Sequence, residues 1–179
     1  MIIGIVGSIG SGKTLFMTYL LKRYLEKGMT VMTNYRVKIP HTLIDRETIR
    51  RYADKNNPLK DCVLALDEAH ILLDCRTSYK NTMISYFILQ TRKRGVTLLY
   101  TTQNFLNVEK RLREQTDYIF QCSPIYDRIG DKKLLIAVKV LITQYYGHDR
   151  YRDLKRLVLR HPETVYKLYD TYEIVNFEK

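Results

Sequence analysis

Cysteine is scarce in this chain, and that scarcity excludes several kinds of protein. The 179 residues include three cysteines, an odd and widely spaced set. In a chain long enough to fold without cross-links, such a set is typical of reduced thiols in the cytosol rather than of a disulfide framework. No spacing of cysteine and histidine resembles a metal site. The sequence therefore predicts a cytoplasmic protein that relies on an apolar core.

Long apolar runs are also missing. The longest, Leu134–Ile142, is interrupted by Lys139 and is far too short to cross a bilayer. The N-terminus is apolar but has neither a basic leader nor a cleavage site of small residues, as a secretory signal would. We therefore expect a soluble protein with no integral membrane segment.

Acidic residues are few compared with basic ones. The 19 Asp and Glu residues face 30 Lys and Arg residues, which leaves a net charge of +11. Such an excess suits a polyanionic partner, and nucleic acid is the partner that we favour. An anionic membrane surface, or a basic protein with no such partner, remains the alternative. With 45% hydrophobic residues, the length fits a single domain over residues 1–179.

Short apolar runs alternate with helical patterns through residues 1–123, the expected core of the domain. This alternation requires crossover connections and predicts a three-layer α/β fold, with a mostly parallel central sheet between helices. The expected strands are Met1–Val6, Met29–Tyr35, Cys62–Leu66, Val96–Thr101 and Tyr118–Cys122, and the expected helices are Leu15–Lys27, Ile44–Lys55, Thr82–Arg92 and Val108–Gln115.

Residues 124–179 follow a different pattern and are expected to form a small antiparallel or helical extension of the same domain. Leu134–Tyr146 is β-like, as the second arm of a hairpin that turns near Gly130-Asp131 would be. The basic segment Arg150–Arg160 fits either the solvated face of an amphipathic helix or a surface that contacts DNA phosphates. The second interpretation assigns DNA binding to Arg150, Arg152, Lys155 and Arg156.

A glycine-rich motif joins the first strand to the first helix. It matches G-x-x-x-x-G-K-[ST] over Gly7, Ser8, Ile9, Gly10, Ser11, Gly12, Lys13 and Thr14. In such a loop the glycines let backbone N–H groups turn toward phosphate oxygens, and the helix N-terminus favours the same anion. Lys13 is expected to reach the β- and γ-phosphates, and the Thr14 hydroxyl to bind Mg²⁺. This motif is the P-loop. It predicts an α/β fold of the P-loop type that binds Mg-ATP.

Two carboxylates follow the apolar strand Cys62–Leu66. Asp67 is expected near the magnesium ion, at the end of a strand beside the P-loop strand, and Glu68 is expected to act as the general base that polarises the attacking water. The competing interpretation is an acidic pair that caps the next helix.

Two further residues are candidates for contact with the γ-phosphate. Gln103 follows an apolar strand and could act as a sensor, although strands often end in a polar residue. Arg92, in the run Arg92-Lys93-Arg94, is the candidate for an arginine finger inserted into a neighbouring subunit. Cations are favourable at a helix C-terminus in any case, and Arg111 and Arg113 are candidates of lower rank.

These motifs occur in an order that resembles the FtsK–HerA-type ATPases. The run Leu98-Leu99-Tyr100-Thr101-Thr102-Gln103-Asn104, the pair Thr33-Asn34 and the segment Val108–Asp117 add to the likeness, which covers about the first 125 residues. Within that group the chain is similar to compact viral genome-packaging ATPases and to the zonula-occludens-toxin-like assembly ATPases of filamentous phages.

The resemblance implies a homo-oligomeric ring that moves double-stranded DNA, hydrolyses ATP between subunits, and docks on capsid or portal vertex proteins in the host cytoplasm or with the virion. It also implies that the strand leading to Gln103 lies between the P-loop strand and the Asp67 strand. Toxin-like members usually continue into a membrane span, so its absence here favours genome packaging over filamentous-phage-type assembly.

Two other functions remain open. A nucleoside kinase shares a P-loop and a nearby Asp-Glu pair, but such kinases also carry a four-cysteine zinc site, which this sequence lacks. A nucleotide-regulated assembly protein without directed motion would hydrolyse ATP slowly and would not respond to DNA.

Overall fold

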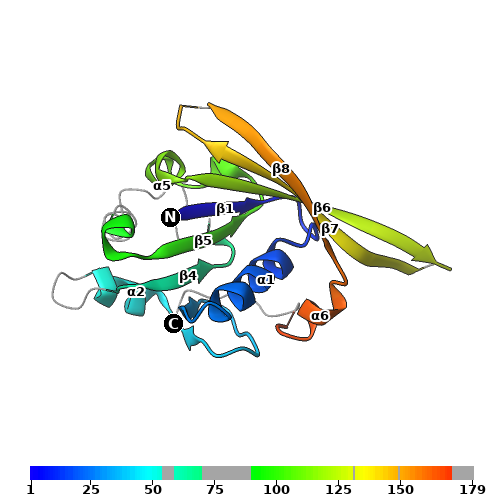
Figure 1. Cartoon of the computed structure of the whole chain (residues 1–179), viewed down its shortest axis with the longest axis horizontal. Coiled ribbons are helices and arrows are strands. Elements are labelled where there is room, and N and C mark those ends of the chain that lie inside the picture. The colour runs from blue at the N-terminus through cyan, green and yellow to red at the C-terminus, as the bar shows by residue number, and fades with distance from the viewer. Residues whose placement is uncertain (54–58, 70–89, 131, 149, 171–179) are drawn as a thin grey trace.

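A single mixed β-sheet organises the chain. The computed structural model describes residues 1–53, 59–69, 90–130, 132–148 and 150–170. Within them the sheet has eight strands in the order β3-β2-β4-β5-β1-β6-β7-β8 (Figure 1), with β7 and β8 antiparallel to their neighbours and the other pairs parallel. The strands are β1 Ile2–Val6, β2 Thr30–Thr33, β3 Thr42–Leu43, β4 Cys62–Leu66, β5 Thr97–Thr102, β6 Tyr118–Ile129, β7 Lys132–Tyr145 and β8 Tyr151–Arg160.

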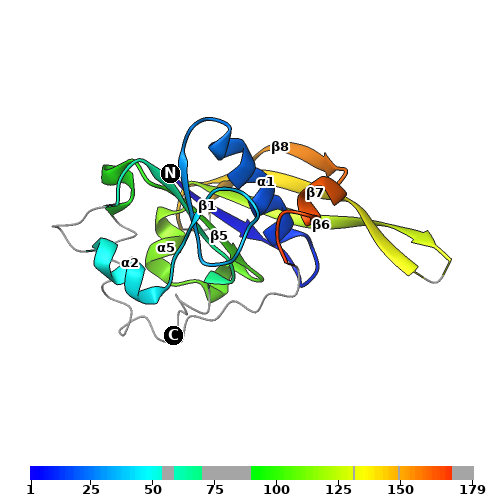
Figure 2. The ribbon, with the colours of Figure 1, turned by 90° about the horizontal axis from the view of Figure 1, so that it is seen from below.

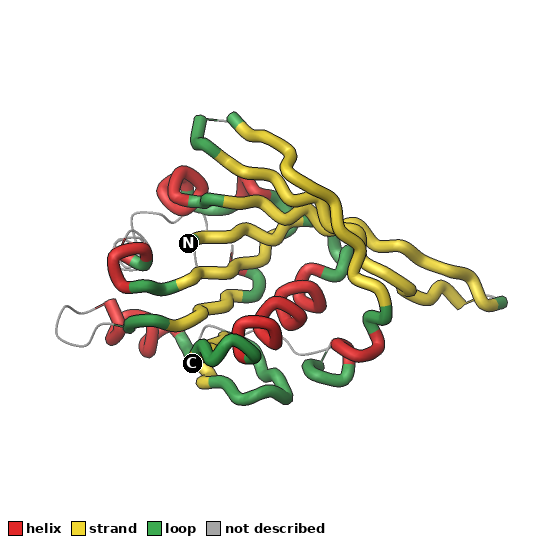
Figure 3. Tube along the Cα trace, viewed as in Figure 1, coloured by secondary structure: helices red, strands yellow, loops and turns green. Residues whose placement is uncertain are grey.

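Helices cover both faces of this sheet (Figures 2 and 3). Helix α1 (Lys13–Leu25) packs on one face, and α2 (Arg46–Ala53) and α5 (Lys110–Gln115) pack on the other. Because successive residues of a strand point to opposite faces, each central strand contributes to both layers. Toward α1 lie Ile3, Val63 and Leu99, and toward α2 and α5 lie Ile2, Leu64 and Leu98. The expected three-layer α/β fold is confirmed.

The order of the central strands confirms one expectation and corrects another. Strand β5, which leads to Gln103, pairs with β1 on one side and with β4 on the other, as the resemblance implied. Asp67 therefore follows a strand that lies two places from the P-loop strand, and the expectation that the two strands are adjacent was wrong. The chain returns from β4 to place the later strand β5 between β4 and β1.

The C-terminal part is an antiparallel addition built on a long β6. Strand β6 continues beyond Cys122, and β6 and β7 form a hairpin that projects from the body of the molecule (Figure 1) and turns at Gly130, whose φ is 61°. The helix expected over Thr82–Arg92 lies mostly outside the described residues. At its end, Arg92–Arg94 forms a short 3-10 helix, η2.

The basic segment Arg150–Arg160 forms strand β8, so the interpretation of this segment as an amphipathic helix was wrong. Its apolar residues fit either period, and the choice is made by β7, whose outer edge would otherwise leave its backbone groups unpaired. The register shifts between Ile142 and Thr143, so that Leu154 forms a bulge. After β8 the chain turns into a short helix, α6 (Glu163–Tyr166), that the sequence did not predict.

Candidate functional site

The glycine-rich loop leaves the carboxyl end of β1 and enters α1. Its glycines are required by close contacts. A Cβ on Gly12 (φ 86°) would lie 2.6 Å from Val138 Cγ2, and one on Gly7 would lie 2.7 Å from the Cys122 carbonyl oxygen. The loop therefore wraps tightly against β6 and β7. Lys13 is buried, and its Nζ donates a hydrogen bond to the Ser8 carbonyl oxygen at 3.1 Å. This bond fixes the positive charge of Lys13 at the loop.

Asp67 lies directly beside this loop. The Thr14 hydroxyl is 3.1 Å from both carboxylate oxygens of Asp67, and the Thr101 hydroxyl donates to Asp67 Oδ1 at 2.6 Å. Burial raises the pKa of Asp67, while the hydrogen bonds from Thr101 and Thr14 and the charge of Lys13 act in the opposite direction. A buried carboxylate beside a threonine hydroxyl is a set of hard oxygen ligands, and the donor chemistry fits Mg²⁺.

Two residues that fix Asp67 and Glu68 were not singled out in the sequence as site residues. The Asn34 side chain bonds the backbone of Asp67 twice, accepting from its N–H at 2.7 Å and donating to its carbonyl oxygen at 2.9 Å. The Thr101 hydroxyl accepts from the Glu68 N–H at 2.8 Å while it donates to Asp67. Asn34 follows β2 and Thr101 lies near the end of β5, the two strands beside β4, and that position is the signal that could have identified them.

Glu68 has an unusual backbone conformation. Its φ is 50°, in the left-handed region that residues other than glycine rarely adopt. Such strain is found where the surrounding structure holds it, here through the bond from Glu68 N–H to Thr101. The Glu68 side chain lines the same cavity as Lys13 and Thr14, so the structure brings the expected base to the P-loop.

This cavity has a volume of about 250 Å³. A larger cavity of about 560 Å³ lies between α1 and the strands β6–β8, and its lining is largely apolar. We place the nucleotide in the smaller cavity because that one contains the P-loop and Glu68. Its lining is Ile9, Gly10, Gly12, Lys13, Thr14, Leu15, Glu68, Leu135, Tyr166 and Tyr169.

The remaining candidates for γ-phosphate contact are not gathered at this cavity. Gln103 lies exposed just after β5 and is not among the described residues that line the cavity. Arg92 begins η2, which precedes β5 and therefore lies at the sheet edge opposite the P-loop. The Arg92 side chain lies outside the described part of the structure. Arg111 Nε lies 3.8 Å from Glu109 Oε1, and Arg113 lines a separate cavity at the end of α5.

The four predicted DNA-binding residues do not share one surface. Arg150 lies in the turn before β8. In β8, Arg152 and Lys155 pair with Gln144 and Ile142, which places them on the face that α1 covers. Arg156 pairs with Leu141 and points to the opposite face. The last strand of the sheet therefore divides these cations between its two sides.

On that opposite face, Arg156 lies near two other cations, Lys139 of β7 and Arg160 at the end of the same basic segment. Lys139 pairs with Val158, and Arg156 and Arg160 are the diagonal neighbours of Lys139 on β8. All three side chains are exposed. We call Lys139, Arg156 and Arg160 the basic sheet face.

The strand, glycine loop and helix, with Asp67 and Glu68 beside them and β5 between, define this chain as a P-loop ATPase that binds nucleotide. The sequence matches the Zonular occludens toxin (Zot) family over residues 1–174, and the chain belongs to that family. No curated protein matches it.

Solved structures share the fold at low sequence identity. The N-terminal domain of zonular occludens toxin from Neisseria meningitidis is 20% identical with a TM-score of 0.65, and the match covers 94% of this chain and 98% of that one. The genome-packaging NTPase B204 of Sulfolobus turreted icosahedral virus 2, in complex with ATP-gammaS, is 15% identical with a TM-score of 0.59 over 86% of this chain and 96% of that one. The flagellar accessory protein FlaH of Methanocaldococcus jannaschii is 11% identical, with a TM-score of 0.57 over 89% and 84%.

Among the described residues, no helix has the length and apolar character needed to span a membrane.

Proposed function

We propose that this chain is a Mg²⁺-dependent ATPase of virus assembly that moves double-stranded DNA. The observation that carries the proposal is a continuous set of hydrogen bonds from the P-loop to the expected base: Thr14 to Asp67, Asp67 to Thr101, and Thr101 to the Glu68 N–H. Phosphate binding alone does not require a second carboxylate held in this way, whereas hydrolysis does.

The polar residues at and beside the P-loop have distinct parts in the proposed hydrolysis. Lys13 and the loop N–H groups bind the β- and γ-phosphates, and Thr14 and Asp67 would hold the Mg²⁺ ion, which supplies charge neutralisation at the phosphates. Glu68 orients a water molecule and accepts its proton as the water oxygen bonds to the γ-phosphorus. The bond from that phosphorus to the bridging oxygen breaks, and ADP and phosphate leave. We propose that Gln103, at the end of β5, contacts the γ-phosphate or this water.

The basic sheet face is our candidate for DNA contact. Its cations stand on β7 and β8, and all of them are exposed. Contacts from Lys and Arg to phosphate are independent of base sequence and weaken as salt rises. A motor that moves along DNA of any sequence needs contacts of this kind.

We propose that the chain acts as a homo-oligomeric ring. The run Arg92–Arg94 lies at the sheet edge opposite the P-loop of its own subunit. An arginine at the amino-terminal ends of the strands can serve as a finger only in the site of a neighbour, where it would neutralise charge in the transition state.

Two assembly roles fit this motor. The family match favours filamentous-phage-type assembly, and the likeness to B204 supports genome packaging through the fold. The expectation that a missing membrane span favours packaging carries no weight now, because the matching Neisseria structure is itself an N-terminal domain. Either role places the chain in the host cytoplasm or on the virion, with capsid or portal vertex proteins as candidate partners for packaging.

The experiment is the steady-state ATPase rate of the full chain with and without long double-stranded DNA, at low and moderate salt. We expect DNA to raise the rate, salt to reduce the effect, and Glu68→Gln to abolish it. The same rate is measured with single-stranded DNA. Stimulation by single-stranded DNA alone would identify that form, instead of the duplex, as the substrate. A rate that is raised by nucleosides and unchanged by DNA at every protein concentration would refute the motor.

A matched pair of variants tests the basic sheet face. Arg156→Ala/Arg160→Ala removes two cations from that face, and Lys155→Ala/Arg152→Ala removes two from the other face of the same strand. Each lost phosphate contact lowers the slope of log affinity against log salt by about 1. The first variant should therefore lower the slope by about 2, and the second should leave it near the wild-type value. Equal effects would contradict the assignment.

A further inference from the structure

The cavity at the P-loop is lined by more than the groups that would hold phosphates. The glycine loop, Lys13, Thr14 and Glu68 form one part of its lining. Three further lining residues come from the C-terminal part of the chain, namely Leu135 of β7, Tyr166 at the end of α6, and Tyr169 just after it. We call these three residues, two of which are aromatic, the aromatic wall. Nothing in the chemistry of phosphate binding explains why aromatic rings should line the same cavity.

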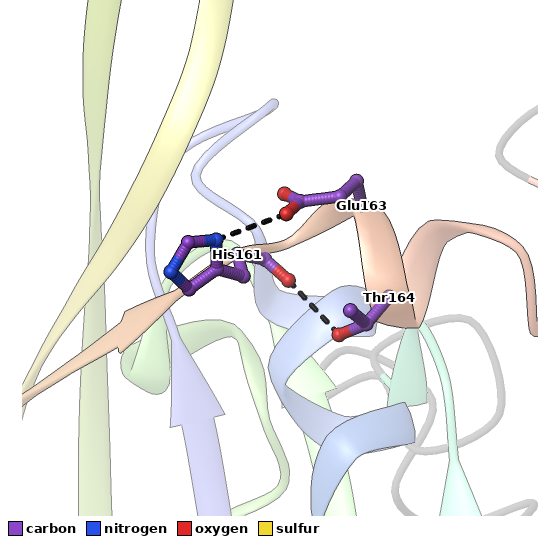
Figure 4. Close-up of polar contacts among 3 residues, drawn as sticks. All are labelled: His161, Glu163 and Thr164. Carbon is purple, nitrogen blue, oxygen red and sulfur yellow. Dashed lines mark hydrogen bonds and ion pairs between the residues drawn. The ribbon is translucent and has the colours of Figure 1, made fainter.

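The segment that carries Tyr166 and Tyr169 is fixed by contacts at both of its ends. The chain leaves β8 and turns at His161, whose φ is 55°. Two contacts shape the start of α6 (Figure 4): the Thr164 hydroxyl donates a hydrogen bond to the His161 carbonyl oxygen, and His161 Nδ1 lies 3.0 Å from Glu163 Oε1. Beyond α6, Lys38 N–H donates to the Leu168 carbonyl oxygen, and Tyr169 forms an antiparallel bridge with Val37. The two tyrosines therefore stand in the cavity on an anchored segment.

The two rings present flat surfaces rather than charges. Their centroids are 6.4 Å apart at an interplanar angle of 27°, which is a stacked arrangement. Burial raises the pKa of each phenol, with a further contribution to Tyr169 from Tyr166 and Asp67, so both rings stay neutral at physiological pH. Beside them, the Tyr126 hydroxyl donates to the Gly10 carbonyl oxygen at 3.1 Å, which extends the aromatic surface to the P-loop.

We propose that Tyr166 and Tyr169, with Leu135, bind the nucleoside part of the nucleotide, with the base packed against the tyrosine rings. This inference rests on the proposed ATPase function and adds the recognition of the base to it. Since every base has a π-face, stacking discriminates weakly between bases with the same number of rings. The site is therefore expected to accept ATP and GTP with similar affinity, and to bind purine nucleotides more tightly than the smaller pyrimidines.

The test is titration calorimetry of the full chain in Mg²⁺ with three ligands: a non-hydrolysable ATP analogue, the matching GTP analogue, and inorganic tripolyphosphate. Tyr166→Ala and Tyr169→Ala should each weaken both analogues by roughly tenfold, since stacking on one aromatic ring contributes about that factor. Neither variant should change the affinity for tripolyphosphate, which has no base. Tyr166→Phe and Tyr169→Phe keep the ring and should bind as the wild type does.

The controls separate this inference from the function on which it rests. Tyr151→Ala removes an exposed tyrosine from β8 and should change nothing. Lys13→Ala should abolish binding of all three ligands, and failure of the wild type to bind tripolyphosphate would refute the P-loop assignment instead. Loss of tripolyphosphate binding in the Tyr→Ala variants would make the wall a structural element, and weak binding by the Phe variants would assign recognition to the hydroxyls. Either of these two results overturns the stacking proposal.

Discussion

Thr101→Val should separate ATP binding from ATP hydrolysis. The Thr101 side chain is fully buried at the end of β5, and its hydroxyl bonds Asp67 Oδ1 at 2.6 Å and the Glu68 N–H at 2.8 Å. Valine has nearly the same shape and suits a strand, so the substitution removes two hydrogen bonds and little packing. The P-loop and Lys13 are unchanged, so binding should persist.

The size of both effects follows from these contacts. A hydrogen bond to a charged group contributes about 1.5–3 kcal/mol, and a buried N–H left without a partner costs about 1–3 kcal/mol. Since Asp67 keeps its contact with Thr14, we expect the free energy of unfolding to fall by about 2–4 kcal/mol. Glu68 would lose the bond that supports its φ of 50°, and a displacement of a reacting group by about 1 Å can cost roughly 100-fold in rate.

The assays are steady-state ATPase kinetics and urea unfolding on the same preparations. We expect kcat to fall by about 10- to 100-fold and KM for ATP to stay within about threefold of the wild-type value. Thr101→Ser keeps the hydroxyl and should restore most of kcat. Thr102→Val is the matched control, because it removes one buried hydroxyl from the neighbouring position, where the bond goes to the Asn104 carbonyl oxygen. A kcat within twofold of wild type in a folded Thr101→Val protein would refute the positioning of Glu68 by Thr101.

Three further predictions follow from the same structure. Glu68→Gln should bind ATP normally in a nucleotide titration and lower kcat by at least about 100-fold, since it removes the proton acceptor but keeps the shape. Asn34→Ala should lower the free energy of unfolding in urea by about 1–3 kcal/mol and reduce kcat, because both of its hydrogen bonds to the Asp67 backbone are lost. Burial raises the pKa of Cys62 to about 11 and that of Cys122 to about 12, so in a Cys75→Ser background a thiol reagent at pH 8 should modify neither residue before unfolding. Because these thiols keep their protons longer in the folded state, the free energy of unfolding should fall as pH rises above about 8.5, and a flat pH profile between pH 8 and 10 would contradict the shifts.

The parts of the fold that could be predicted were those with strong local constraints. The P-loop requires glycine at positions where a Cβ would collide with β6 or β7, so its sequence pattern is nearly its structure. The buried strands β1, β4 and β5 were recognisable because a parallel strand covered on both faces is apolar throughout. Their lateral order depends on chain crossovers that no local pattern records, and only the resemblance indicated it.

The parts that could not be predicted depend on contacts between distant segments. The period of Arg150–Arg160 fits a helix as well as a strand, and the free edge of β7 decides the outcome. Asn34 and Tyr166 are ordinary polar and aromatic residues in the sequence. Their importance arises because β2 ends beside β4, and because α6 returns to the P-loop after the sheet has ended. A prediction limited to motifs therefore found the residues expected to bind the phosphates and missed the residues that we assign to the base.

If Arg92 is the arginine finger, a single subunit is an incomplete enzyme. The nucleotide cavity lies at the carboxyl ends of β1, β4 and β5, while η2 lies before the amino end of β5. Since β5 and β1 are parallel, η2 and the P-loop of the same chain lie at opposite ends of these strands. If Arg92 is the finger, a neighbour must set its opposite edge against this cavity, and that head-to-tail contact closes into a ring or extends into a filament. Hydrolysis would then depend on protein concentration, and Arg92→Ala subunits would regain activity when mixed with Glu68→Gln subunits, because a mixed contact can pair an intact base with an intact finger.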